Sequence, residues 1–225
     1  MQTHPLFICA GAGMVAIVKT KHADDCITVE LDNGESLKIP YQVTGMYRLE
    51  AGRVIDPTEY AQLREESQRY RCKRAALNYL AISPRSATEM ERYLGKKGFD
   101  HHLIKEIVDG FRNSGYIDDV DYAAHYISNK LSRKLVGKNL LFNELMKKGI
   151  PRNVIRQALK ESESVHSNFD QVLAIAEKKY GALKEKKNGI VKLAYFLHSR
   201  GFDSDLVNAV IDRIRRKDKE SFDDD

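Results

Sequence analysis

The sequence predicts a mainly α-helical fold, in which tandem three-helix, helix-turn-helix-like repeats form an elongated, curved array behind a small amino-terminal β module. One observation is a block that occurs three times, at residues 90–111, 141–162 and 193–214. Its turn glycines are 51 and then 52 residues apart. A second observation is that strand-like alternation is confined to the first part of the chain. A repeat of this period is typical of arrays that stack similar helical units.

The three blocks share apolar residues at fixed distances from the glycine. Each has Leu four residues before it and a large apolar residue directly after it. The three sets are Leu94, Gly98 and Phe99; Leu145, Gly149 and Ile150; and Leu197, Gly201 and Phe202. Further apolar pairs follow at spacings that place them on one helical face. Each block is therefore two helices that cannot bury this face alone, and stacked repeats of this kind present extended surfaces that bind large partners.

Residues 1–55 are expected to form the small β-rich module. Alternation from Val15 to Lys21 and the runs CITVEL and ESLKIP read as strands, and Asp32-Asn33-Gly34 joins the last two. Asn-Gly predicts a two-residue hairpin turn with positive φ at both positions. One short helix and a strand should complete the module before Val54, while the order of residues 1–13 stays open.

Helix signals divide the rest of the chain. Asp56, Pro57 and Glu59 predict a capped, long linking helix over 56–82 that runs into the first repeat, and Ser86 with Glu89 forms a second capping box. The three-helix repeats are predicted at 71–118, 119–161 and 170–216. The polar residues 161–169 read as a linker, and 217–225 as a disordered acidic tail.

Composition restricts the class of protein. The chain has 225 residues, and its three cysteines, Cys9, Cys26 and Cys72, form no C-x-x-C pair. This pattern fits a reducing cytoplasm and argues against disulfides and a zinc site. The apolar stretch near the amino terminus is too short for a membrane span and lacks the charged start of a signal peptide. We therefore expect a cytoplasmic, monomeric protein.

The positive charge is concentrated in the first two repeats. Residues 71–161 carry 18 basic and 10 acidic side chains, within a chain of net charge +5. Between Arg133 and Arg156 the single acid is Glu144. A basic helical surface indicates a polyanionic partner, with nucleic acid favoured over membrane. The candidate contacts are Lys96, Lys97, Arg133, Lys134, Lys138, Lys147, Lys148, Arg152 and Arg156. The third repeat has Ser199 and Arg200 at the turn, which favours protein contact there.

No catalytic, metal or cofactor site is predicted. Asp118 and Asp119 precede a helix and read as caps, and the adjacent His101 and His102 project about 100° apart on a helix and cannot easily share a metal. Gly11-Ala12-Gly13 lacks the rest of a phosphate-binding loop. Core packing is expected for Leu94, Phe99, Tyr122 and Ile150. Packing is also expected for most of the tyrosines that are able to stack on bases, which are Tyr60, Tyr70, Tyr79, Tyr93, Tyr116, Tyr122, Tyr126 and Tyr195.

Two motif runs carry a family resemblance. Ser86-x-x-Glu89-x-x-x-x-Leu94-x-x-x-Gly98-Phe99 is followed by Gly-Tyr-Ile-Asp-Asp-x-x-Tyr-Ala at residues 115–123, and the run from Lys138 to Pro151 continues the match. The sequence over about residues 73–160 resembles the RecX family of regulators of the RecA recombinase. The resemblance implies a helical array in the groove of the RecA filament on single-stranded DNA. It also implies inhibition of that filament's ATP hydrolysis, strand exchange and co-protease activities.

Two other functions compete with this one. A tandem helix-turn-helix protein that reads duplex DNA, such as a transcription regulator, should place Arg, Asn or Gln at the start of each second helix. The second helices open with HHLIKE, RNVIRQ and SDLVNA, and only the middle one approaches this pattern. A nucleic-acid-processing enzyme would need a carboxylate cluster or metal ligands on one face. The sequence therefore favours sequence-independent DNA binding.

Overall fold

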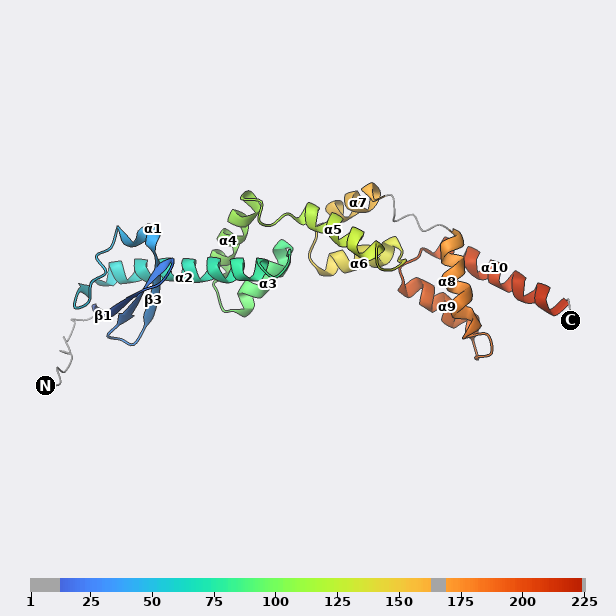
Figure 1. Ribbon diagram of the computed structural model, residues 1–225, viewed down its shortest axis with the longest axis horizontal. Helices are drawn as coiled ribbons and strands as arrows, with labels where there is room; N and C mark the ends of the chain where they lie inside the picture. The colour runs from blue at the N-terminus through green and yellow to red at the C-terminus, as the bar shows by residue number, and fades with distance from the viewer. Residues whose placement is uncertain (1–12, 163–168, 224–225) are drawn as a thin grey trace. The chain divides into compact units, whose positions relative to one another are not determined.

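The computed structural model describes residues 13–162 and 169–223, which fall into two compact units (Figure 1). One unit holds the described residues up to Ser83 together with Met90–Asn113, and the other holds Pro84–Glu89 together with the described residues from Ser114 onward. Within these described ranges helices dominate, and strands occur only in the amino-terminal part. The predicted fold class of tandem helical repeats with a small β module is confirmed. The expectations for residues 1–12 and for 163–168 of the linker lie outside the described residues.

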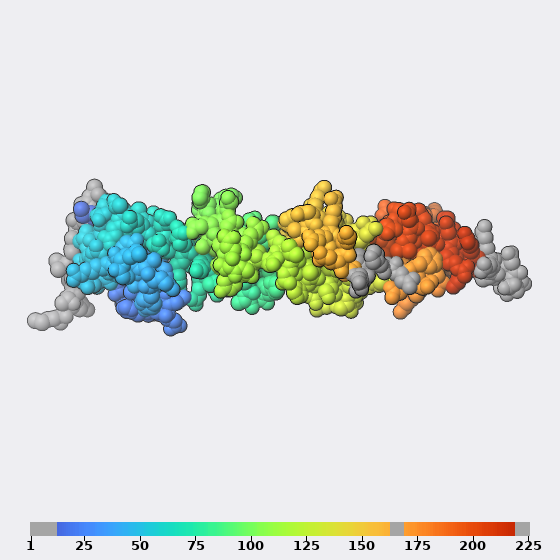
Figure 2. Space-filling view, turned by 90° about the horizontal axis from the view of Figure 1, so that it is seen from above, coloured from blue at the N-terminus to red at the C-terminus, as the bar shows by residue number. Residues whose placement is uncertain are grey.

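The β module is an antiparallel sheet with strand order β3-β2-β1-β4. Its elements are β1 (Val15–His22), β2 (Cys26–Leu31), β3 (Ser36–Pro40), α1 (Tyr41–Thr44) and β4 (Val54–Ile55). Alternate side chains of the strands are buried and pack against Leu63 of α2 (Pro57–Leu80). In Figure 2 the blue atoms of the module accordingly lie against the cyan atoms of α2. The sheet thus obtains its core from the helix that follows it.

The turn between β2 and β3 differs from the predicted one. Only Gly34 has a positive φ, of 83°, and its amide donates to the Leu31 carbonyl at 3.0 Å. The Leu31 amide donates to the Glu35 carbonyl at 2.9 Å, so the loop is longer than two residues and ends in a left-handed glycine. The Asn33 side-chain oxygen accepts from the Glu35 amide at 2.9 Å, which favours this longer loop.

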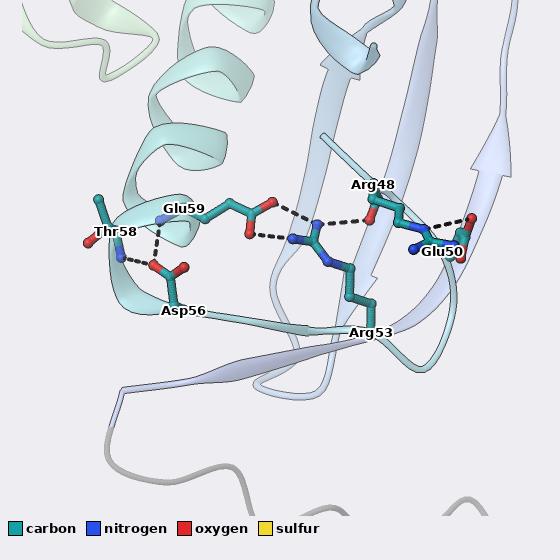
Figure 3. Close-up of polar contacts among 6 residues, drawn as sticks. All are labelled: Arg48, Glu50, Arg53, Asp56, Thr58 and Glu59. Atoms are coloured by element: carbon teal, nitrogen blue, oxygen red, sulfur yellow. Dashed lines mark hydrogen bonds and ion pairs between the residues drawn. The ribbon is translucent and has the colours of Figure 1, made fainter. Parts of the chain in front are cut away.

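At the start of α2 the predicted helix cap by Asp56 is confirmed, whereas the predicted return bond from Glu59 is wrong (Figure 3). Asp56 accepts from the amides of Thr58 and Glu59 at 2.8 and 3.0 Å, as a helix cap should. The Glu59 carboxylate does not return to the Asp56 amide. It accepts two hydrogen bonds of 2.7 Å from Arg53 instead, because a bidentate, charge-assisted pair is stronger than a single bond to an amide. This pair fastens the strand β4 region to the helix.

The remaining helices belong to tandem three-helix repeats. They are α3 (Ala87–Lys96), α4 (His101–Asn113), α5 (Asp119–Leu131), α6 (Lys138–Lys147), α7 (Arg152–Glu161), α8 (Phe169–Gly181), α9 (Gly189–Ser199) and α10 (Ser204–Asp223). The disordered tail predicted from residue 217 is wrong for 217–223, which continue α10. Tyr180 donates to Asp218 at 2.6 Å and Lys184 pairs with it at 2.9 Å, so side chains before α9 hold this part of α10.

The positions that defined the repeat are core positions. Leu94, Leu145 and Leu197 are completely buried, and Ile150 and Phe202 are 2% exposed. The core role predicted for Leu94 and Ile150 is confirmed, whereas Phe99 and Tyr122 are half-buried. Repeat two has its own core around Ile127, Leu141 and Ile155, and repeat three around Val172, Leu193 and Val207.

Candidate nucleic-acid interface

The three repeats share one turn geometry. Gly98, Gly149 and Gly201 have φ of 83°, 79° and 83°, the left-handed conformation that ends a helix. In each turn the amide after the glycine donates to the carbonyl of the Leu four residues before the glycine, at 3.4, 3.2 and 3.4 Å respectively. This bond pattern is the Schellman motif, and it normally brings the two residues flanking the turn into apolar contact. The motif explains why Leu and the large apolar residue recur at fixed offsets.

The start of α3 packs against the turn of repeat two. The hydroxyl of Ser86 donates to the Lys148 carbonyl at 2.6 Å, and the side chain of Thr88 packs directly on Gly149. Ser86 and Glu89 also form the predicted capping box, with bonds of 3.1 and 3.2 Å. The glycine therefore terminates α6 and leaves room for a neighbouring helix end.

The start of α6 packs against the turn of repeat three in the same way. The amides of Gly137 and Asn139 donate to the carbonyls of Arg200 and Gly201 at 2.8 and 3.1 Å. These amides belong to a helix start, where intrahelical acceptors are lacking. The Arg200 guanidinium donates to the Leu135 carbonyl at 3.3 Å and lies 4.8 Å from the Phe196 ring centre. Arg200, the third-repeat counterpart of the turn lysines, is therefore part of this packing.

The side chain of Lys148 takes part in the contact between the turn of repeat two and the start of α3. Its ammonium pairs with Glu89 at 2.8 Å and lies 5.5 Å and 5.4 Å from the ring centres of Tyr122 and Tyr126. Tyr122 also donates to Glu89 at 3.0 Å. Burial opposes the charge on Glu89, but the hydrogen bonds from Lys148, the Ser86 amide and Tyr122 together with the charge of Lys148 outweigh burial and lower the pKa of this carboxyl. Burial likewise opposes the charge on Lys148, and the bond to Glu89 raises its pKa. Lys148 thus holds the contact together.

The other predicted basic residues of repeat two lie near the two ends of α6. Arg133 and Lys134 are exposed in the turn before it, and Lys138 starts it, 3.8 Å from Asp203. The exposed Lys147 ends α6. On α7, the exposed Arg152 and Arg156 are one helical turn apart and therefore share a face. A ten-residue helix is about 15 Å long, so α6 separates two basic clusters by about that distance.

Glu144, the acid among these residues, does not neutralise the surface. Its carboxylate accepts from Lys130 at 2.8 Å and from Tyr126 at 2.9 Å. Burial opposes its ionisation, but the hydrogen bonds from Lys130 and Tyr126 together with the charges of Lys130 and Lys147 outweigh burial, so the pKa of Glu144 is lowered. Among the described residues, no acidic side chain pairs with Arg133, Lys134, Lys147, Arg152 or Arg156.

In repeat one, Lys96 and Lys97 are both exposed at the turn. The Lys97 ammonium lies 5.7 Å from the centre of the Tyr93 ring, which itself stacks on Tyr79 at 4.0 Å. Sequence reasoning missed the basic side chains of α2, where Arg71, Lys73 and Arg74 follow one another closely. Four basic residues among the six from 69 to 74 were the available signal.

Most of the tyrosines considered for base stacking are at least partly packed, as predicted. Tyr116 and Tyr195 differ, with exposed fractions of 62% and 76%. Tyr122 and Tyr126 stack on each other with ring centres 6.4 Å apart. Exposed aromatic surface therefore occurs in the connection before α5 and on α9.

The two predicted cap residues, Asp118 and Asp119, cap different helices. Asp118 caps α5 by accepting from the amides of Val120 and Asp121 at 2.8 and 3.0 Å. Asp119 instead accepts from the Ala87 amide at 3.0 Å and so caps α3. Across the described residues, no group of three His, Cys, Asp or Glu side chains is arranged to hold a metal ion. In the same part of the chain, no helix has the length and apolar character of a membrane span.

Comparison with known proteins matches all three repeats to one family. Its models for the first, second and third three-helix domains of RecX match residues 72–109, 118–159 and 167–211. A protein named regulatory protein RecX from Clostridioides difficile is 24% identical over 90% of this chain and 96% of its own length. One of the same name from Streptococcus agalactiae is 28% identical over 92% of this chain and 81% of its own.

Solved structures show the same fold. A crystal structure titled regulatory protein RecX covers 88% of this chain and 99% of its own, with a TM-score of 0.67 and 21% identity. The RecX structure from Lactobacillus salivarius covers 66% of this chain and 97% of its own, with a TM-score of 0.55 and 24% identity.

Proposed function

The chain belongs to the RecX family of regulatory proteins, and from that membership we propose that it binds the filament of RecA on single-stranded DNA and inhibits it. The inhibited activities are ATP hydrolysis, strand exchange and co-protease activity. The protein acts as a cytoplasmic monomer, without catalysis or a cofactor of its own. Its partners are RecA protomers and the DNA strand they enclose.

The observation that carries the DNA part of this proposal is the unneutralised charge of repeat two. Lys147 ends α6, Arg152 and Arg156 lie in the first half of α7, and Arg133 and Lys134 precede α6. The Glu144 carboxylate binds Lys130 and Tyr126 and forms no ion pair with these cations. They are therefore available to contact a polyanion. Contacts of this kind bind phosphates without reading sequence.

Regulation requires a difference in affinity between filament states. A protein that contacts neighbouring RecA protomers and the strand shifts the filament only if it binds one of its conformations more tightly. With the basic clusters of repeat two on the strand and the exposed Val191 and Tyr195 of α9 against protein, one molecule engages both components. Such a ligand either holds the filament in one state or blocks its growth.

The single-stranded-DNA-dependent ATPase rate of the cognate RecA tests the proposal directly. Titration of this protein well below one molecule per RecA should inhibit strongly, because one bound molecule then affects many protomers. Unchanged ATPase at equimolar protein would overturn the proposal. If the protein instead bound duplex DNA of a particular sequence, the helix-turn-helix alternative would replace it.

Charge reversal tests the proposed strand contact. Arg152→Glu with Arg156→Glu should weaken binding to an oligothymidine and reduce the salt slope, log Kd against log salt, by about 1.4, since each lost single-strand phosphate contact removes about 0.7. Arg213→Glu with Arg216→Glu is the matched control, because both residues are exposed on α10. Equal slopes for the two double variants would place the DNA contact elsewhere.

A further inference from the structure

A groove lies within the first unit, between the β module and repeat one. The turn between β1 and β2, strand β3, the middle of α2, and the end of α3 with its turn form its walls. Its volume is about 590 Å³. Neither the family models nor the basic face of repeat two includes the strand residues that form one side of it.

The groove is positively charged. Lys38, Arg71, Arg74 and Lys97 line it, against the two acids Asp24 and Asp25. Arg74 is paired with Asp25. The other three basic side chains are exposed, and among the described residues no carboxylate lies within ion-pair distance of them. The groove therefore presents three uncompensated cations from three different elements.

The walls of the groove are fixed to one another. Tyr70 donates to Asp25 at 2.8 Å, which lowers the pKa of this carboxyl together with the charge of Arg74. Asp25 is consequently ionised at neutral pH and ties the turn of the sheet to α2. On the other side, the amide of Lys38 donates to the buried hydroxyl of Ser67 at 2.8 Å. The cations thus project from a preformed frame.

Aromatic side chains accompany these cations. Tyr70, Tyr93 and Phe99 also line the groove, and each is half-buried. A positively charged groove with aromatic rings is the usual construction for unpaired nucleic acid, since phosphates contact the cations and bases stack on the rings. A duplex keeps its bases stacked inside and makes no use of such rings.

We propose that the β module and repeat one together form a second binding groove for single-stranded DNA, in which Lys38, Arg71 and Lys97 contact phosphates. The β module then has a function of its own and lengthens the contact with the strand. This inference rests on the strand-binding part of the proposed function and adds a site to it.

The test uses the full chain and a fluorescent oligothymidine in the absence of RecA. Lys38→Glu with Arg71→Glu should weaken binding measured by anisotropy and lower the salt slope by about 1.4, at about 0.7 for each phosphate contact. Lys19→Glu with Lys21→Glu is the matched control, because both side chains are exposed on β1 of the same module and neither lines the groove. The control should keep the wild-type slope. Circular dichroism melts of both variants should match the wild type.

A second readout does not depend on a variant's folding. An oligonucleotide carrying 5-iodouracil, irradiated with the unaltered protein, should crosslink to peptides that contain Tyr70 or Tyr93. Crosslinks confined to repeat two, or equal salt slopes for the two double variants, would overturn the inference. Preferential binding of an acidic peptide of equal charge would also overturn it. The proposed function is tested separately, because it fails if the wild type leaves RecA ATPase unchanged, whatever the groove binds.

Discussion

Alanine replacement of the three turn glycines should destabilise the protein in a graded order. All three have φ near 80°, which costs an L-residue about 1–2 kcal/mol. A methyl group at Gly98 meets nothing within 4 Å, so only this cost applies there. At Gly149 it would lie 2.3 Å from the Thr88 Cβ, and overpacking adds about 1–3 kcal/mol. At Gly201 it would lie 2.2 Å from the backbone nitrogen of Leu140, which no side-chain rotation relieves, so this variant should lose most.

Hydrogen exchange measures these losses locally, which matters because a chain with two units need not unfold in one step. The informative amides are those of Phe99, Ile150 and Phe202, whose bonds close the three turns. Thr88→Gly should recover part of the loss in the Gly149→Ala variant, with a coupling energy of about 1 kcal/mol or more. Equal losses at all three glycines, or no coupling, would refute the claim that neighbouring helix starts pack on these turns.

Two further predictions concern ion pairs. Because the pKa of Glu89 is lowered from 4.5 in the folded state, its contribution to stability is present above that pH and lost as pH falls through the lower folded value. Acid unfolding of Glu89→Gln should lack this part of the pH dependence and start from a lower stability, since Lys148 loses its partner; identical acid curves would contradict the assignment. Arg53→Lys, which replaces the bidentate bond to Glu59 with a single one, should cost about 1 kcal/mol in urea unfolding, and an unchanged midpoint would show that the pair adds nothing.

Local signals in the sequence determine much of the fold. A glycine between a Leu and a large apolar residue at Schellman spacing identifies each turn, because all the bonds involved lie within six residues. The same holds for the caps at Asp56 and Ser86. By contrast, Asn33 and Glu59 adopt different contacts from the predicted ones, since nearby partners compete with the standard motif.

Site residues were harder to assign because their contacts are distant in sequence. Lys147 and Lys148 are adjacent and chemically identical, yet only Lys148 meets Glu89, 59 residues earlier. Asp119 precedes α5 but caps α3. The groove likewise combines Lys38 with Lys97, and no periodicity along the chain connects a strand with the turn after α3. Charge composition therefore indicates that a polyanion binds but not which cations remain available to it.

The repeat architecture itself explains why cations at the turns have two roles. Each turn exposes carbonyl groups that can accept hydrogen bonds from the start of another helix. In repeat two the donor is the Ser86 hydroxyl, and in repeat three it is the Gly137 amide. A basic residue beside such a turn is then drawn into the packing, as Lys148 and Arg200 are. At Gly98 an added Cβ would meet nothing within 4 Å, and Lys97 beside this turn is exposed at the edge of the groove. In this protein the position of a turn along the array therefore decides whether its cation stabilises the fold or is available to bind DNA.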